Sequence, residues 1–463
     1  MQSYEVREIK VGQAHGAPRV WLEGKRLAKA GFQIGAKYLL SVGNHCVTLK
    51  IAADGERVVS AKKKAGEELP LIDLNSAKAL GLFEGLERLR VIVRKDEIHL
   101  LPLASQKKAA ERLARIAGKI SRGEPLKVGS LCHGGGTTSY AMHEGMAEGG
   151  VVTKLAFAND HEPEVLMHAS EVNPAWSDDT VAVAAPMQEI VTDEWLLGRL
   201  GYVDLLEAGI PCTAASLSGR SKKGLKMAEE DPDAGHLVVP FLALVERLQP
   251  AVIVVENVVP YQSTASAHLI RHTLRDWGYN VAEAVLDAQD FGSIEARKRL
   301  ALVATTAGLL FDFNLVQKDP REHRLAEVLE AIAPDAECWS EMGYLRTKEE
   351  RDAAAGKGFR MQIVGPESTK IGTIGADYQK NRSTEPKVRH PVQGDALLRL
   401  LTPIEHARIK GVPDAMIAGM PATRAHHLLG NGVSVQAFRA LAVALAKCLV
   451  DAFAIRAQQQ AAA

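Results

Sequence analysis

Hydrophobic and polar residues alternate in two different patterns along this chain, and the change falls near residue 125. Before this point, short runs with a period of two are separated by turns that contain glycine, a pattern that predicts β-strands. After it, apolar runs of buried-strand length alternate with stretches of helical period. Such alternation predicts a parallel sheet with helices on both faces. We therefore expect an α/β protein that carries a separate, small β-domain at its N-terminus.

The N-terminal region repeats one plan twice. Each copy has a strand, a short helix and two further strands, at residues 19–22, 25–30, 37–42 and 46–51, and again at 71–74, 76–80, 89–93 and 98–101. A repeat after about fifty residues indicates an internal duplication. A helix predicted at 105–120 follows, and Gly123 and Pro125 end it.

The first copy carries a recognisable motif. Residues 22–35 (LEGKRLAKAGFQIG) resemble the SymE-like branch of the AbrB-type swapped-hairpin proteins, and the resemblance covers residues 17–102. It implies that two units in one chain close a small β-barrel, a fold often used on DNA. The alternative is a small β-domain that only packs on its neighbour.

A glycine-rich turn lies between the strand predicted at 127–132 and the helix predicted from residue 139. The glycines at 134–136 let the backbone approach a ligand, and the free amides of a helix start favour polar groups. The turn lacks the lysine of a P-loop and the third glycine of a dinucleotide fingerprint. Asp160, which ends the next strand, is suited to hold a ribose diol. These features predict a nucleoside-like cofactor, and a turn without a ligand is the alternative.

Cys212 lies on the loop that follows the strand-like run at 203–206. In open α/β sheets, ligands bind at the edge formed by the carboxyl ends of the strands, which is where this loop is expected. A cysteine outside a disulfide is most often a small core residue. The other candidate residues along the chain indicate instead that Cys212 is a nucleophile beside a cofactor site. Glu256 would be the neighbouring acid, and Arg297 and Arg299 would form a basic clamp.

Six motifs in a fixed order make the function more specific. They lie at residues 131–136, 209–216, 256–258, 291–299, 399–414 and 429–434. With these motifs, residues 126–450 resemble the DNA (cytosine-5) methyltransferases. The resemblance implies a Rossmann-like methyltransferase fold, S-adenosylmethionine as cofactor, and methyl transfer to C5 of cytosine in DNA.

The family's chemistry explains the residue types. C5 of cytosine is a poor nucleophile, and attack of the Cys212 thiolate on C6 makes it electron-rich. A proton held at N3 by Glu256 assists this attack. Arg297 and Arg299 would bind the base carbonyl and neighbouring phosphates. Because the target atom is hidden in double-stranded DNA, the nucleotide must flip out.

The resemblance also implies the remaining contacts. The cofactor is expected to contact Cys132, His133, Gly134, Gly136, Asp160, His161, Met187, Gly209, Pro211, Asn431 and Val433. DNA is expected to contact Ser216, Asn257, Lys370, Lys380 and Arg382. The histidines lack the spacing of metal ligands, and no metal is predicted.

Several positions depart from the family pattern. Cys132 replaces the usual aromatic residue before the glycine turn, and no acid stands at 184–187, near the expected adenine. Residues 213–215 (Thr-Ala-Ala) replace a glutamine and an aromatic residue, which motivates the hypothesis of an enlarged substrate pocket. Glu295 replaces a glutamine, and we expect its negative charge near the DNA path.

Two alternatives to DNA cytosine methylation stay open. The first is that RNA or an already modified pyrimidine is the substrate. The second is a DNA-binding regulator whose methyltransferase body has lost turnover. The missing acid and Glu295 motivate the second.

The changes in pattern mark the N-terminal boundaries, and the resemblance to the methyltransferases implies the division of the rest. The expected domains are the swapped-hairpin domain at 1–103, a helical linker at 104–125, the catalytic domain at 126–307, a target-recognition region at 308–395, the C-terminal part of the catalytic domain at 396–455 and a tail at 456–463. In the target-recognition region, Lys387 and Arg389 are further candidates for phosphate contacts, which position DNA without reading its sequence. A solvated loop region is the alternative.

Composition is ordinary for a soluble protein, with 46% hydrophobic and 24% charged residues among 463. We expect no membrane span and no secretory signal. Five scattered cysteines argue against a disulfide framework or zinc site and indicate a reducing cytoplasm. The resemblance to the DNA methyltransferases implies a bacterial or phage-encoded protein near the nucleoid. Residues 1–125 carry roughly nine more basic than acidic residues, which fits a polyanion partner or a basic solvated surface. The oligomeric state stays open, with a monomer as one option.

Overall fold

The computed structural model describes residues 5–462 except 15, 65, 212–214, 216–222, 320 and 383, with side chains up to Ala454. The chain divides into two compact units, Met1–Lys108 and Ala109–Ala463. The division falls inside the helix α3 (Ala104–Ser121), whereas we expected the first domain to end at residue 103. Arg112 of this helix is buried and donates to Thr306 Oγ1 and Gln249 Oε1. The second half of α3 is therefore part of the second unit and not a free linker.

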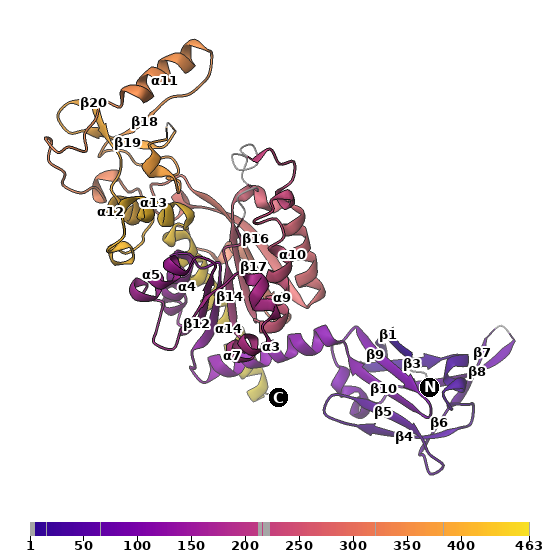
Figure 1. The fold of residues 1–463 in the computed structure, drawn as a ribbon. Coiled ribbons are helices and arrows are strands. Elements are labelled where there is room, and N and C mark those ends of the chain that lie inside the picture. Colours follow the sequence, from indigo (N-terminus) through magenta and orange to yellow (C-terminus); the bar gives the residue numbers. More distant parts are fainter. Residues whose placement is uncertain are drawn as a thin grey trace. The chain divides into compact units, whose positions relative to one another are not determined.

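The first unit contains two antiparallel sheets, with strand orders β1-β9-β10-β5-β4-β6 and β2-β3-β8-β7 (Figure 1). Its strands are β1 (Glu5–Lys10), β2 (Gly12–Ala14), β3 (Ala17–Glu23), β4 (Lys37–Val42), β5 (Val47–Ile51), β6 (Arg57–Val58), β7 (Ser60–Lys64), β8 (Glu67–Leu74), β9 (Arg88–Arg94) and β10 (Glu97–Pro102). Its short helices are α1 (Lys25–Lys29) and α2 (Ala77–Leu80).

The two halves of this unit have the same element order and pair symmetrically. β3 pairs with β8, and β5 pairs with β10, both antiparallel. The helix of each half is followed by a buried phenylalanine, Phe32 or Phe83, in one shared core. The repeated order agrees with the predicted duplication. The resemblance to SymE-like proteins stays a prediction.

The second unit is built on a seven-stranded sheet with the order β13-β12-β11-β14-β15-β17-β16. Its strands are β11 (Leu126–Leu131), β12 (Thr153–Asp160), β13 (Val181–Ala184), β14 (Leu205–Ala208), β15 (Val252–Asn257), β16 (Tyr279–Asp287) and β17 (Lys298–Thr306). The first five are parallel, and β16 and β17 are antiparallel additions. The predicted α/β class is confirmed.

Helices cover both faces of this sheet, because each face is apolar. They are α4 (Thr137–Glu148), α5 (Pro163–Val172), α6 (Met187–Thr192), α7 (Glu194–Leu200), α9 (Val238–Leu248), α10 (Ala265–Asp276) and the long α14 (Val435–Ala462). One core contains Met142 of α4 and Leu441 of α14. The other contains Phe241 of α9 and Ile270 of α10. The loops that carry the predicted site lie at the carboxyl ends of the central parallel strands.

In the sequence between β17 and the C-terminal helices, the chain forms a small additional region. Its labelled elements in Figure 1 are α11 (Gly343–Ala354), β18 (Gln362–Val364), β19 (Pro386–His390) and β20 (Gly394–Arg399). The chain then returns through α12 (Pro403–Ile409) and α13 (Ala422–Asn431). A capping box begins α12, since Thr402 Oγ1 accepts from Glu405 N at 3.1 Å and Glu405 Oε2 accepts from Thr402 N at 2.8 Å. Glu405 also pairs with Arg399 at 2.7 Å, which fixes this return.

Among the described helices, none taken singly has the length and apolar composition needed to cross a membrane. One bent pair, Ala422–Asn431 with Val435–Ala454, passes that test by length and composition.

Candidate active site

The glycine turn between β11 and α4 has a backbone that only small residues tolerate. Gly134 and Gly136 have φ angles of 55° and 72°, in the left-handed region. A Cβ atom at Gly136 would lie 2.3 Å from Asn173 Nδ2 and 2.4 Å from His133 Nε2. Gly134 N donates to Asp160 Oδ2 at 2.7 Å, so the acid at the end of β12 holds the turn. The turn leaves the first amides of α4 without a side-chain cap.

The two residues before the glycines face inward. Cys132 has a φ of 55°, and burial raises the pKa of its thiol, with Asp160 as a smaller cause. His133 is 8% exposed; Trp176 Nε1 donates to its Nε2 at 3.1 Å, and its Nδ1 lies 2.8 Å from Ser130 Oγ. Burial lowers the pKa of His133 to about 3, so the ring is neutral. Its ring nitrogens therefore support the turn from beneath, and the expected cofactor contact by the His133 side chain is replaced by this structural role.

The other expected cofactor residues divide into two groups. Asp160 uses both carboxylate oxygens on backbone amides, those of Gly134 and Glu162, while the exposed His161 lies 3.1 Å from it. Met187, at the start of α6, is 4% exposed and packs in the core. Asp160 and His161 thus lie beside the turn, whereas the Met187 side chain is mainly a core residue.

The last motif lies against the glycine turn, which agrees with the expectation that Asn431 and Val433 share a cofactor site with that turn. Val433 N donates to Thr137 Oγ1 at 3.2 Å, and a Cβ atom at Gly432 would lie 2.6 Å from the same oxygen. Asn431 ends α13 and is exposed beside this contact. Residues about 300 positions apart therefore enclose the start of α4.

The loop that leads to Cys212 begins against an acid and an arginine. Gly209 follows β14, and a Cβ atom on it would lie 3.7 Å from Glu256 Oε2 and 3.6 Å from the Cys132 carbonyl oxygen. Glu256, at the end of β15, forms an ion pair with Arg299 at 2.7 Å. Both side chains are mostly shielded, with 13% and 16% of their surface exposed. The structure thus brings together the predicted acid, one predicted arginine and the beginning of the predicted nucleophile loop.

Asn257 has a different task from the one that we expected. It is 2% exposed, and its Nδ2 donates to the Ile210 carbonyl at 3.1 Å. Its side chain anchors the loop before Pro211 and does not face DNA, so the predicted DNA contact is wrong. Cys212 and Ser216 lie outside the described residues, as do Thr213 and Ala214.

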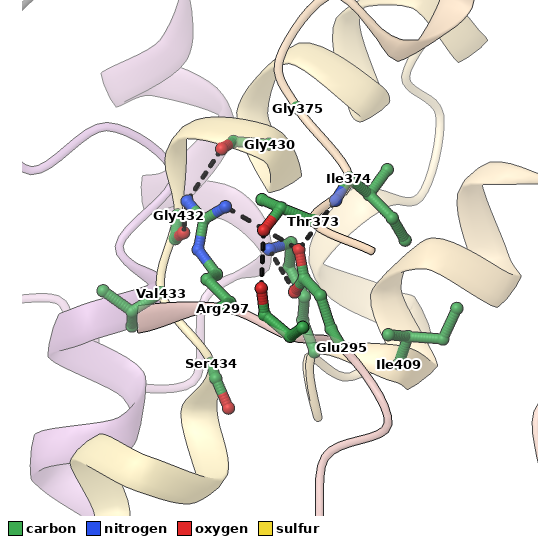
Figure 2. Close-up of polar contacts among 12 residues, drawn as sticks. Glu295, Arg297, Thr373, Ile374, Gly375, Ile409, Gly430, Gly432, Val433 and Ser434 are labelled. Carbon is green, nitrogen blue, oxygen red and sulfur yellow. Dashed lines mark hydrogen bonds and ion pairs between the residues drawn. The ribbon is translucent and has the colours of Figure 1, made fainter. Parts of the chain in front are cut away.

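The segment before β17 is buried, and Figure 2 shows its polar contacts. Arg297 is 2% exposed and donates through Nη2 to the carbonyls of Gly430 at 2.8 Å and Gly432 at 2.6 Å. Glu295 is fully buried and accepts from Lys410 Nζ at 2.8 Å and from Ile374 N at 2.9 Å. Arg297 therefore ties together segments of the fold and does not reach a base.

The expectation that Glu295 adds a negative charge to the DNA path is also wrong. Burial acts to raise the pKa of Glu295, but the attraction of Lys410 and Arg297 outweighs it and lowers the pKa. Burial lowers the pKa of Lys410 to about 7 and that of Arg297 to about 10. Glu295 is thus ionised inside the protein and neutralised by its neighbours.

Replacing Glu295 by glutamine is expected to lower the free energy of unfolding by about 2 kcal/mol, because the buried Lys410 loses its charged partner. Lys410→Gln alone should cost a similar amount, since Glu295 then keeps a charge without its ammonium group. The double variant should recover most of the loss, because two amides can bond each other. Urea unfolding followed by circular dichroism measures all three; losses that simply add would contradict the coupling.

The basic residues of the region after β17 also divide into two groups. Lys370, Lys380 and Arg382 are exposed, and the last two pair with Asp377. Lys387 is fully buried, and its Nζ donates to the carbonyls of Arg382 at 2.8 Å and Glu385 at 3.1 Å. The suggested phosphate contact of Lys387 is therefore wrong, because its charge is used to hold a turn.

Sequence reasoning missed two supporting residues. Lys410 is buried opposite Glu295, and the replacement of a glutamine by Glu295 was the signal that a compensating cation should be sought. Asn173 donates to the carbonyls of Gly135 at 3.1 Å and Gly136 at 3.0 Å. Its position at the C-cap of α5, next to Pro174, was the available signal. Among the described residues, no group of three or more histidine, cysteine or acidic side chains is arranged to hold a metal ion.

Comparison with known proteins covers most of this unit. The family model of the C-5 cytosine-specific DNA methylases matches residues 188–447. The type II methyltransferase M.NlaX of Neisseria lactamica is 32% identical over 248 residues, which are 52% of this chain and 74% of that protein. The type II methyltransferase M1.ScrFI of Lactococcus lactis subsp. cremoris is 28% identical over 251 residues, 52% of this chain and 61% of that protein.

Solved structures show the same fold. The S. pombe Dnmt2 methyltransferase matches with a TM-score of 0.53 at 18% identity, over 70% of this chain and 98% of that one. The Entamoeba histolytica methyltransferase EhMeth matches with a TM-score of 0.54 at 19% identity, over 71% and 98%.

Proposed function

We propose that this chain, which belongs to the C-5 cytosine-specific DNA methylase family, carries out the reaction of that family with the residues assigned below. The reaction is S-adenosylmethionine-dependent transfer of a methyl group to C5 of cytosine in DNA. The observation that carries the proposal is the meeting of Glu256, Arg299 and Gly209 at the loop that leads to Cys212.

The residues around the glycine turn fit the cofactor. A Cβ atom at Gly134 would meet nothing within 4 Å, so the turn is open on one side, while Gly136 has no room for a side chain. The uncapped start of α4 offers amides to a carboxylate, and Asp160 and His161 lie next to it. Asn431 and Val433 close the opposite side. When bound, S-adenosylmethionine supplies a methyl group on a positively charged sulfur.

Catalysis requires the cytosine to leave the duplex, because its C5 and C6 atoms are stacked between base pairs. We infer that the Cys212 thiolate attacks C6, which forms a carbon–sulfur bond and makes C5 nucleophilic. Glu256 holds a proton at N3, and Arg299, its partner in the free protein, orients this carboxyl and the base. After methyl transfer, the C5 proton passes to water, the bond between C6 and the Cys212 sulfur breaks, and the proton at N3 returns to Glu256, which restores the aromatic ring and the thiolate.

The remaining parts of the chain receive supporting roles in this proposal. Residues 308–395, with the exposed Lys370 and Arg382, contact DNA and select the target. The duplicated N-terminal unit adds a second, basic contact to DNA. Because the curated relatives named above are bacterial type II methyltransferases, we infer DNA modification in a bacterium or a phage.

The function is tested with S-adenosylmethionine carrying a labelled methyl group, offered with double-stranded DNA and, in parallel, with RNA. We expect label in 5-methyldeoxycytidine after digestion of the DNA to nucleosides, and no label in the RNA. Label in another nucleoside, or in RNA alone, would overturn the assignment.

A further inference from the structure

Glu207 is a buried carboxyl group that the proposed mechanism does not use. It lies on the central strand β14 and is 1% exposed. Ser130 is its register partner on β11, and Val254 is its partner on β15. Neither of its carboxylate oxygens accepts a hydrogen bond of ordinary geometry among the described residues, although the hydroxyls of Ser130 and Ser139 lie near enough to favour its charged form. An acid without a partner inside a sheet is costly, which calls for an explanation.

Its surroundings connect it to the cofactor turn. Because Trp176 donates to His133 Nε2, the neutral ring of His133 carries its proton on Nδ1 and donates to Ser130 Oγ. The hydroxyl hydrogen of Ser130 is then free to point toward Glu207. His133 also accepts from Gly136 N at 2.8 Å through its carbonyl. On the other side, Glu207 is two residues before Gly209. The carboxyl group thus lies beneath both loops that we assign to the cofactor.

This carboxyl group changes its charge near neutrality. Burial raises the pKa of Glu207 to about 7, although the hydroxyls of Ser130 and Ser139 face it and act to lower the pKa. No ionised side chain contributes to this shift. The imidazoles nearby keep their charge state, because burial lowers the pKa of His133 to about 3 and that of His143 to about 4.

We propose that Glu207 is a specificity-determining residue for the cofactor, whose ionised carboxylate favours the positive sulfonium of S-adenosylmethionine over the neutral thioether of S-adenosylhomocysteine. This inference rests on the proposed function of the glycine turn. The preference would favour release of S-adenosylhomocysteine after the reaction, since methyl transfer removes the positive charge that the carboxylate attracts.

The expected size follows from electrostatics. Two unit charges about 10 Å apart, in a medium with an effective dielectric constant of about 20, change a binding constant by roughly tenfold. The two ligands share their adenosine, amino and carboxylate groups, and any titration of the ligands themselves appears equally in the wild type and in Glu207→Gln, so the difference between the two proteins reports on Glu207. The preference for S-adenosylmethionine should therefore rise as the pH increases through about 7, by roughly tenfold for a separation on the order of 10 Å.

The test measures the dissociation constants of S-adenosylmethionine and S-adenosylhomocysteine by calorimetry at pH 5.5, 7 and 8.5, with the full chain. In Glu207→Gln the ratio should rise much less with pH than in the wild type, and in Glu207→Asp, which keeps an ionisable group, most of the rise should remain. Glu144→Gln is the matched control, because it removes a carboxylate from an exposed position of α4 and should behave like the wild type. Lys410 and the exposed His161 are unchanged in all variants, so a pH effect that they cause would survive in Glu207→Gln.

Folding is checked by melting temperature. The pKa of Glu207 is higher in the folded than in the unfolded chain, so its contribution to stability is lost as the pH rises toward about 7. Glu207→Gln should therefore melt higher than the wild type at pH 8, with a difference that shrinks toward pH 5.

A ratio that does not change with pH in the wild type, or that changes as much in Glu207→Gln as in the wild type, would overturn the inference. Failure of both ligands to bind the wild type would instead overturn the proposed function of the turn.

Discussion

Replacement of Cys212 by serine is expected to abolish methyl transfer to DNA while the protein still binds S-adenosylmethionine. The nucleophile must be an anion at neutral pH, and a thiol provides one far more readily than an alcohol. The start of its loop is fixed independently of residue 212, because Asn257 holds the Ile210 carbonyl and Gly209 N donates to Leu131 O at 3.3 Å. The substitution therefore changes the chemistry and leaves the entry of the loop intact. We expect a loss of activity of more than about 10³-fold, measured with labelled methyl groups.

Cys448→Ser is the matched control, because Cys448 lies on α14 outside the residues proposed for cofactor and DNA, and a serine hydroxyl can keep its hydrogen bond to the Leu310 carbonyl. It should keep wild-type activity. A second readout uses DNA in which fluorine replaces the hydrogen on C5 of the target cytosine. Fluorine cannot leave as a cation, so the wild type should remain covalently attached to this DNA, and Cys212→Ser should not. Residual turnover of Cys212→Ser near the wild-type level would exclude the covalent mechanism.

Much of the fold could be predicted because hydrophobic periodicity reports directly on burial. The strand predicted at 127–132 became β11, the next strand, which ends at Asp160, became β12, and the glycine turn that follows β11 begins a helix. The position of Asp160 at the end of a strand was also readable, because the carboxyl ends of parallel strands meet at one edge. The repeated element order of the first unit was visible for the same reason.

Residue roles that depend on burial could not be read from the sequence. Arg297 and Lys387 carry charges that usually face solvent, yet both donate to backbone carbonyls inside the protein. Glu295 is compatible with the core only because Lys410, 115 residues later, lies 2.8 Å from it. A single sequence does not reveal such long-range pairs, since nothing local marks them. The missing acid at 184–187 and the charge of Glu295 were the two reasons to consider a DNA-binding regulator that has lost methyltransferase activity. The burial of Glu295 removes the second reason.

The second large effect is expected at Glu256. Glu256→Gln should lower kcat by about 10²–10⁴-fold, because an amide cannot hold a proton at N3 of the cytosine. Arg299 would keep a hydrogen-bond acceptor in the glutamine, so the geometry of the pair changes little. Binding of DNA should therefore change much less than kcat.

The matched control for Glu256 lies on the same sheet. Glu283 of β16 forms an ion pair with Arg271, and the two side chains are 13% and 12% exposed, as shielded as the pair of Glu256 and Arg299. Glu283→Gln removes the same charge from a similar environment without touching the loop that leads to Cys212. If Glu256 only stabilises the fold, the two variants should lose the same stability and similar activity. If it handles the proton at N3, only Glu256→Gln should lose turnover, and single-turnover rates with saturating DNA decide between these outcomes.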